Sequence, residues 1–209
     1  LLCIALGGVS ALALAPAVAQ DAQGGLDEVT VTAQRRAENQ QDVPVSVATV
    51  PSARLDAYLA GAEDIRALAT RVPGLYAESS NGRVAPRFYI RGLGNTDFDL
   101  AASQPVSVIM DDIVKENVIL KSFPLFDVAQ VEVLRGPQGT LFGRNTPAGI
   151  VKFDSVKPGK DLNGYLRASY GRFNQVSLEG AVGGNLSGEK VSARLSLFYQ
   201  RQDDYVDNV

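Results

Sequence analysis

Three stretches near the C-terminal end of the chain alternate apolar and polar residues with a period of two, and this pattern restricts the fold more than any other. Residues 165–170 read YLRASY, with the leucine, the alanine and the last tyrosine on one face. The stretches 176–182 and 191–200 repeat the alternation, and every charge inside the three lies on the polar face. Because successive side chains of a strand point to opposite faces, the pattern predicts three amphipathic β-strands joined by short polar turns.

Alternating runs of about 10 residues that end in tyrosine are typical of transmembrane β-barrel strands. A soluble antiparallel sheet with one solvated face shows the same alternation and is the alternative. A leader-like N-terminus and small residues beside large aliphatic ones on the apolar face favour the barrel. Three strands cannot close, and each unpaired backbone group in lipid costs on the order of several kcal/mol. We therefore expect most of the barrel to lie beyond Val209.

The first residues, LLCIALGGVSALALAPAVAQ, combine an apolar core with the small-x-small pattern Ala17-Val18-Ala19 of a signal-peptidase site. A transmembrane helix is the competing interpretation, but the apolar run is shorter than the roughly 20 residues that a span needs and contains Gly7-Gly8 and Pro16. We predict a signal peptide over residues 1–19, partial because a basic segment is missing. Its removal also removes Cys3, the only cysteine.

Composition excludes several kinds of chemistry. The chain has no histidine, which excludes His-based acid–base catalysis, and the single cysteine argues against Cys/His zinc sites and disulfides. The acid pairs Asp111-Asp112 and Asp203-Asp204 are adjacent, so their side chains point apart on a strand, and turn or surface charge is the expected role. The net charge is −3 without a basic patch, so nucleic acid is not an expected partner. We predict no enzyme activity, no metal site and no cofactor.

Residues 20–41 are polar apart from one β-prone island, residues 26–33. A segment of this composition cannot bury enough apolar area to fold alone. We therefore predict a flexible tail over residues 20–41.

Residues 42–158 alternate short strand-like runs with turns and read as a small α+β domain of about 115 residues, with a small mixed sheet and short helices. Ser52 offers an N-cap for a first helix, and Pro73-Gly74 ends a second. The predicted helices cover residues 53–60 and 63–70. The predicted strands cover residues 45–50, 87–91, 106–110, 131–134 and 150–153.

The stretch 131–151, VEVLRGPQGTLFGRNTPAGIV, raises the question of a phosphate-binding loop. Such a loop has two glycines separated by four residues and followed by Lys-Ser or Lys-Thr. Here Gly139 and Gly143 are separated by three residues, and Arg144-Asn145 come next. Gly92-Leu93-Gly94 likewise lacks the third glycine of a dinucleotide fingerprint. These glycines instead predict tight turns and close backbone approaches.

In their order and spacing, the segments resemble the TonB-dependent outer-membrane receptors of Gram-negative bacteria. LDEVTVTAQRR resembles the TonB box and the segment after it, whereas DVPVSVATV, LATRVPGL, FYIRGLG and the 131–151 stretch resemble successive motifs of the plug domain. VSARLSLFYQRQDDYVDN is similar to the third barrel strand and its outer loop. The resemblance covers nearly the whole chain. It implies a plug over residues 42–158 inside a barrel of about 22 strands, whose first three strands occupy residues 159–209.

The resemblance further implies active import, across the outer membrane, of a scarce ligand such as a ferric siderophore, a cobalamin or a saccharide. Energy is expected from the periplasmic C-terminal domain of TonB, and outer-membrane lipid surrounds the barrel. An extended segment on a leash can bind such a partner by adding a strand to its sheet; the alternative is the first strand of the plug sheet. The implied TonB box is Leu26, Asp27, Glu28, Val29, Thr30, Val31, Thr32 and Ala33.

The resemblance also implies an ionic lock in which plug arginines bind barrel carboxylates, here Arg91, Arg135 and Arg144. Arg91 and Arg135 each end a strand just before a glycine, and arginine suits bidentate pairing. Two turns depart from the family pattern, with Gly149 alone where a glycine pair is common and Asp112 where glycine is usual. By analogy, plug loops around residues 95–103 and 113–123 face the ligand. Their candidate residues are Asn95, Asp97, Phe98, Asp99, Lys115, Glu116 and Asn117.

One alternative of another class stays open at this point. A secreted structural or adhesive β-protein with a soluble sheet shares the leader and the alternation, but it predicts no further alternating strands of about 10 residues beyond these three.

Overall fold

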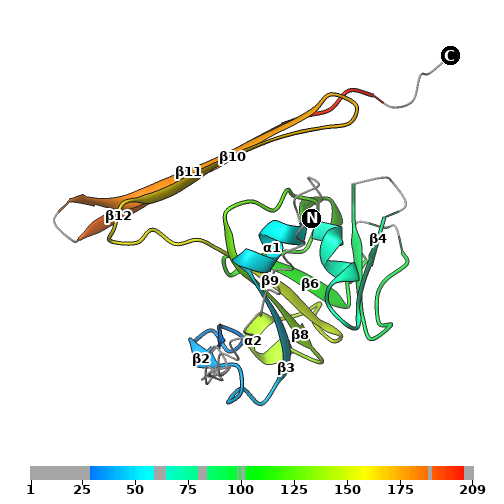
Figure 1. Ribbon diagram of the computed structural model, residues 1–209. Helices are drawn as coiled ribbons and strands as arrows, with labels where there is room; N and C mark the ends of the chain where they lie inside the picture. The colour runs from blue at the N-terminus through cyan, green and yellow to red at the C-terminus, as the bar shows by residue number, and fades with distance from the viewer. Residues whose placement is uncertain are drawn as a thin grey trace, which may run out of the picture.

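The computed structural model places an α+β domain next to a separate sheet of three long strands (Figure 1). The predicted signal peptide, the first three TonB-box residues and Phe98 lie outside the residues it describes. Within the described residues, no helix is both long and apolar enough to cross a membrane. The described residues are 29–58, 65–79, 84–97, 99, 102–187 and 190–204.

The domain is built on a five-stranded sheet in the order β3-β8-β9-β6-β7. Strands β6 and β9 run parallel, and the other neighbours run antiparallel, which confirms the predicted mixed sheet. The strands are β3 (Ser46–Pro51), β6 (Val106–Met110), β7 (Ile113–Lys115), β8 (Val128–Arg135) and β9 (Gly149–Ser155).

Both faces of this sheet are covered. On β8, Val131 and Val133 belong to one apolar core, which includes residues of α1 (Ser52–Tyr58) and of the 3₁₀ helix η1 (Ile65–Thr70). Leu134 belongs to a second core on the other face, together with α2 (Gly139–Phe142). Val133 and Leu134 lie in different cores because successive side chains of a strand point to opposite faces of the sheet. The second predicted helix is 3₁₀ in its described part, a form that suits a short segment that must end before Pro73.

A hairpin of β4 (Leu75–Glu78) and β5 (Arg87–Ile90) extends the domain beside η1, and a short 3₁₀ helix, η2 (Val118–Lys121), comes after β7. Asn117 caps η2 by accepting a hydrogen bond from the Ile119 amide at 3.0 Å. This cap fixes the loop that leaves the sheet after β7.

The two departures from the family pattern leave their turns intact. Asp111 and Asp112 form the β6–β7 turn with φ of 47° and 65°, a left-handed conformation that aspartate tolerates. Asp111 Oδ1 also accepts hydrogen bonds from the amide and hydroxyl of Ser155, both at 2.9 Å. At Gly149, a Cβ would lie 2.2 Å from the Leu134 carbonyl oxygen, so glycine is required there for close backbone approach.

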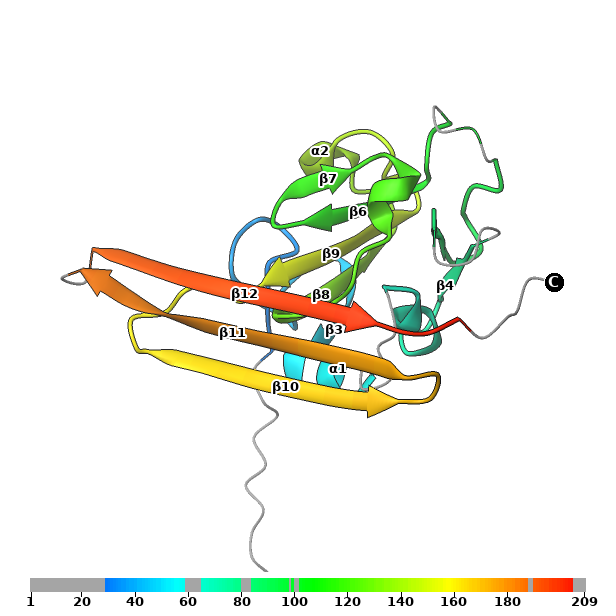
Figure 2. The ribbon, with the colours of Figure 1, turned by 90° about the horizontal axis from the view of Figure 1, so that it is seen from above.

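The C-terminal strands confirm the predicted alternation. They form an open antiparallel sheet in the order β10 (Asn163–Gly171), β11 (Gln175–Ser187) and β12 (Val191–Arg201), which lies along one side of the domain (Figure 2). Phe198 contacts the domain, stacking on Phe126 with ring centroids 5.2 Å apart. The opposite face exposes its large apolar side chains: Leu166, Tyr170, Leu178, Val182, Leu195, Leu197 and Tyr199.

The prediction of a flexible tail over residues 20–41 is wrong for its described part. Strands β1 (Thr30–Val31) and β2 (Glu38–Asn39) form a hairpin, and Val31 and Ala33 are buried in the second core. The segment cannot fold alone, but the α+β domain supplies the apolar surface that it lacks. The alternative, a first strand of the main sheet, is also wrong, because β1 pairs with β2 as a separate sheet.

Candidate functional site

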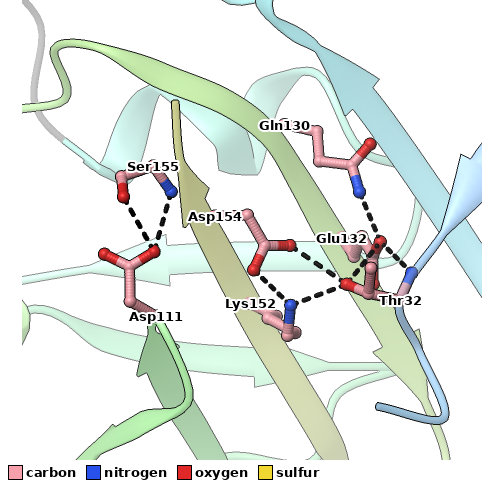
Figure 3. Close-up of polar contacts among 7 residues, drawn as sticks. All are labelled: Thr32, Asp111, Gln130, Glu132, Lys152, Asp154 and Ser155. Atoms are coloured by element: carbon pink, nitrogen blue, oxygen red, sulfur yellow. Dashed lines mark hydrogen bonds and ion pairs between the residues drawn. The ribbon is translucent and has the colours of Figure 1, made fainter. Parts of the chain in front are cut away.

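A buried polar cluster lies where the N-terminal segment meets the two central strands of the sheet (Figure 3). The Thr32 amide donates to Glu132 Oε1 at 2.6 Å. The Thr32 hydroxyl accepts a hydrogen bond from Lys152 Nζ at 2.7 Å. Its single proton is within reach of Asp154 Oδ2 at 3.1 Å and of Glu132 Oε1 at 3.2 Å. Lys152 completes the cluster with an ion pair to Asp154. One residue therefore joins β8, which carries Glu132, to β9.

Burial sets the electrostatics of this cluster. Glu132 is 0% exposed and Lys152 is 2% exposed. Burial raises the pKa of Glu132, against the opposing effects of the Thr32 amide and the Lys152 charge. Oε1 of Glu132 also accepts from Gln130 Nε2 at 2.7 Å, whereas Oε2 has no hydrogen-bond partner among the described residues. The carboxylate therefore depends on the few donors that reach Oε1.

The predicted lock arginines Arg91 and Arg135 meet at one turn, Pro73-Gly74. The Arg91 amide donates to the Gly74 carbonyl at 2.9 Å, and Arg91 has a left-handed φ of 53°. Arg135 Nη2 donates to the Pro73 carbonyl at 3.0 Å, and its Nη1 to Ser46 Oγ at 3.3 Å. Neither guanidinium forms an ion pair in the part of the chain that the structure describes.

Arg144, the third predicted lock arginine, is instead joined to a predicted ligand-loop residue. Its Nε and Nη2 bind the two carboxylate oxygens of Glu116 at 3.1 and 2.8 Å. Both side chains are exposed, and the hydrogen bond from Arg144 holds the pKa of Glu116 below its ordinary value. This pair fastens the loop after β7 to the segment after α2.

The remaining ligand-loop candidates shape their own loop. Asn95 Nδ2 donates to the Ser103 carbonyl at 3.0 Å, which closes the loop. The Asn95 and Asp97 side chains accept from the Asp97 and Asp99 amides, each at 2.9 Å. The structure places Lys115 in β7 and Asn117 at the cap of η2. The polar atoms of Asn95, Asp97 and Asn117 therefore hold the loops in place as well as offering contacts to solvent.

Comparison with known proteins identifies the domain. The model of the TonB-dependent receptor plug domain family matches residues 39–150, more than half of the 209 residues. The chain belongs to this family. The predicted resemblance and the predicted α+β plug fold are confirmed. The match contains Glu132, whereas Thr32, Lys152 and Asp154 lie outside it.

Relatives of this chain are a ferrioxamine B receptor and a pesticin receptor by name. The ferrioxamine B receptor of Salmonella typhimurium is 28% identical over 205 residues, covering 93% of this chain and 28% of the relative. The pesticin receptor of Yersinia pestis is 32% identical over 168 residues, covering 78% of this chain and 23% of the relative. The chain thus spans about a quarter of the length of the curated relatives that it matches.

A solved structure shares the fold of the plug and the strands after it. The pyoverdine outer membrane receptor FpvA from Pseudomonas aeruginosa superposes with a TM-score of 0.71 at 20% identity, covering 85% of this chain and 25% of the receptor. At this identity the likeness shows the fold alone.

Sequence reasoning missed a charged contact between the plug and the C-terminal sheet. Asp127, next to β8, binds Arg194 of β12 through two hydrogen bonds of 2.7 and 2.6 Å, and it also accepts one from the Ser196 hydroxyl. The Asp127 and Arg194 side chains are 6% and 8% exposed. Burial alone raises the pKa of Asp127, but the bonds from Arg194 and Ser196 outweigh it and lower the pKa below its ordinary value.

This contact has the opposite polarity to the predicted lock, because the plug supplies the carboxylate and the strand supplies the guanidinium. The sequence points to one of the two residues in this contact. Arg194 is the one charge among small and apolar residues in the 191–200 run. Its partner obeys no spacing rule, since Asp127 lies 67 residues earlier.

A half-buried tyrosine and a buried lysine support the plug loops and were also missed. The Tyr89 hydroxyl donates to Glu78 Oε1 at 2.6 Å, and burial, reinforced by Glu78, raises the pKa of Tyr89 to about 12. Gly94, at the start of the 95–103 loop, packs against the Tyr89 ring, since a Cβ would lie 1.9 Å from ring atom Cδ1. Lys121, 1% exposed, donates to the Val106 carbonyl at 3.2 Å, and burial lowers its pKa to about 8.

Proposed function

We propose that this chain belongs to an outer-membrane receptor that imports a ferric siderophore into the periplasm with energy received from TonB. The observation that carries the proposal is the attachment of the TonB-box segment to the plug. Residues 29–33 are seated on β8 and β9, so a pull on the segment acts directly on the sheet that would obstruct a barrel.

The named relatives support a siderophore as cargo. One is a receptor for ferrioxamine B and a structural neighbour is a pyoverdine receptor. Cobalamin and saccharide, the other predicted cargoes, have no counterpart among these names, and neither has a secreted adhesive protein. We propose that β10, β11 and β12 are the first strands of a barrel whose apolar face contacts outer-membrane lipid. Export by a signal peptide over residues 1–19 remains a prediction.

Transport tests this function. We expect cells that carry the full-length receptor to accumulate radioactive iron bound to ferrioxamine B, to pyoverdine or to a catecholate siderophore. The host is a Gram-negative strain without its own siderophore receptors, and the matched strain also lacks TonB. Uptake should occur only where TonB is present, because the plug must be moved by an energised partner. Uptake that continues without TonB contradicts the proposal, and so does a failure to take up any of the three chelates.

We also propose that Arg91 and Arg135 bind carboxylates on the barrel wall. Both emerge at the Pro73-Gly74 turn, and both lack an ion-pair partner in the described part of the chain. The placement supports one shared acceptor site on the wall, since arginine matches carboxylate geometry. For Arg144 the support is weaker, because Glu116 already occupies its guanidinium.

Replacing Arg135 by alanine should loosen the plug. The change removes the hydrogen bonds to Pro73 and Ser46, worth about 1–2 kcal/mol for a partly exposed charged donor. Hydrogen exchange of the full-length receptor should show faster exchange at the end of β8 and around residue 73. Arg144→Ala is the matched control and should leave both regions unchanged. A nucleotide should have no effect on either variant, and nucleotide-dependent protection would revive the phosphate-loop interpretation.

A further inference from the structure

We propose that Thr32 is a latch that fastens the C-terminal end of the predicted TonB box to the two central strands of the plug, and that withdrawing it destabilises those strands by opening the cluster of Glu132, Lys152 and Asp154. The latch deepens the proposed function and rests on it, because TonB is the source of the pull. Figure 3 shows Thr32 beside β8 and β9, with its contacts directed to both.

The segment around Thr32 contacts the plug in two ways: through the apolar side chains of Val31 and Ala33, here called the apolar seat, and through the polar groups of Thr32. Its neighbours Val31 and Ala33 are 0% and 1% exposed and pack in the second core with Leu134 and Ile150. Thr32 itself contributes its amide and hydroxyl to the charged groups between these two side chains. The apolar seat binds the segment to the plug. The polar groups of Thr32 bind Glu132 on β8 and Lys152 on β9, so the segment stays bound only while these two strands keep their places.

Withdrawal of Thr32 removes hydrogen bonds from the charged groups of the cluster and leaves them buried. Glu132 Oε1 loses its 2.6 Å bond from the Thr32 amide, and Oε2 already has no partner among the described residues. Lys152 loses the hydroxyl acceptor at 2.7 Å and retains Asp154. A buried network that is only partly satisfied is unfavourable, so water must enter between the strands. The segment is therefore needed for the integrity of the sheet.

The position of the cluster gives this opening a direction. Beyond Glu132, β8 ends at Arg135, which holds the Pro73 turn. Beyond Asp154, β9 leads out of the plug toward β10. Loss of pairing between β8 and β9 at Glu132↔Lys152 thus loosens the plug between its predicted lock and its connection to the C-terminal strands.

Hydrogen exchange of the purified full-length receptor, without siderophore and without TonB, tests the latch. Thr32→Val removes the hydroxyl and keeps the side-chain shape, the amide and the apolar seat. We expect exchange to rise about 10-fold, equivalent to about 1.4 kcal/mol, in peptides that cover residues 29–35, 128–135 and 149–155. Thr32→Ser keeps the hydroxyl and should stay within about twofold of the natural chain. Thr30→Val is the matched control, because Thr30 is exposed and, among the described residues, its hydroxyl forms no hydrogen bond with the cluster.

The pattern of exchange decides the result. Faster exchange in residues 29–35 alone, or in none of the three regions, overturns the latch. A second variant guards against misfolding of Thr32→Val: Glu132→Gln keeps an acceptor and removes the buried charge, so it should reduce the effect of Thr32→Val at least threefold. Equal effects in both backgrounds overturn the proposal as well. Because neither siderophore nor TonB is present, a negative outcome here leaves the import proposal standing, and a lack of uptake in cells leaves the latch standing.

Discussion

Replacing Val29 by proline should abolish siderophore uptake while leaving siderophore binding at the cell surface unchanged. Proline lacks the amide hydrogen and fixes φ, so the segment can no longer pair fully as an added strand in a partner sheet. Val29 is 39% exposed, so its replacement spares the buried seat of Val31 and Ala33. The expected loss of uptake is complete because strand addition to TonB is the only proposed route for energy.

The structure makes Val29 a sharper site for this test than Val31. Val31 is 0% exposed and lies in the second core, so proline there would also detach the segment from the plug. Val29→Ala is the control, since it retains the amide and should import at close to the natural rate. Binding of radioactive ferric siderophore to chilled cells measures the first step, and accumulation in warm cells measures the second. Normal accumulation in Val29→Pro cells would refute strand addition at this residue.

Local pattern predicted much of this fold, because the information lies within a few residues. The period-two runs indicated the three C-terminal strands, and the predicted strand at residues 131–134 lies within β8. Within the 131–151 stretch, Gly149 serves close backbone approach, and Gly136 and Gly143 have the positive φ of tight turns, as predicted. Such features depend on neighbours in sequence, which a single chain displays.

The contacts that matter most for mechanism connect distant residues. Thr32 and Glu132 are separated by 100 positions, and Asp127 and Arg194 by 67. Composition predicted a flexible segment before β3 because composition measures whether a segment can fold alone. It carries no information on whether a neighbouring domain offers a complementary apolar seat, as the plug does to Val31 and Ala33.

These contacts also separate two kinds of attachment. The N-terminal segment is held by the buried side chains of Val31 and Ala33 and by the amide and hydroxyl of Thr32, contacts that a directed pull can remove residue by residue. The plug is held to the C-terminal sheet by a bidentate ion pair that is buried at both ends and by stacked rings at 5.2 Å. Separating a buried ion pair is costly, because each charge is left buried without its partner. The contact with the C-terminal sheet is therefore suited to hold the plug in place while the N-terminal segment is released.

That difference leads to a large expected effect for Asp127→Ala. The change leaves the Arg194 guanidinium, 8% exposed, without its carboxylate, and removing one partner of a buried pair costs about 3–5 kcal/mol. The free energy of unfolding of the full-length receptor in detergent should fall by this amount at neutral pH. Hydrogen exchange should rise around residues 126–128 and in β12. The matched control is Asp203→Ala, which removes an exposed pair with Arg201 at 3.7 Å and should change stability by less than about 0.5 kcal/mol.

The pH dependence of the same variant identifies the cause. The pKa of Asp127 is lowered in the folded protein from an ordinary value of 3.8, so the folded state favours the ionised form. The stabilisation is therefore fully present above the ordinary pKa and is lost as the pH falls through the lower folded value. The natural receptor and Asp127→Ala should differ most at neutral pH and converge in strong acid. A difference that persists unchanged in acid would assign the effect to packing.

A double variant, Asp127→Ala with Arg194→Met, separates the same two causes. If the ion pair is responsible, the double variant is more stable than Asp127→Ala alone, because no unpaired guanidinium remains buried. If packing is responsible, the second substitution recovers no stability.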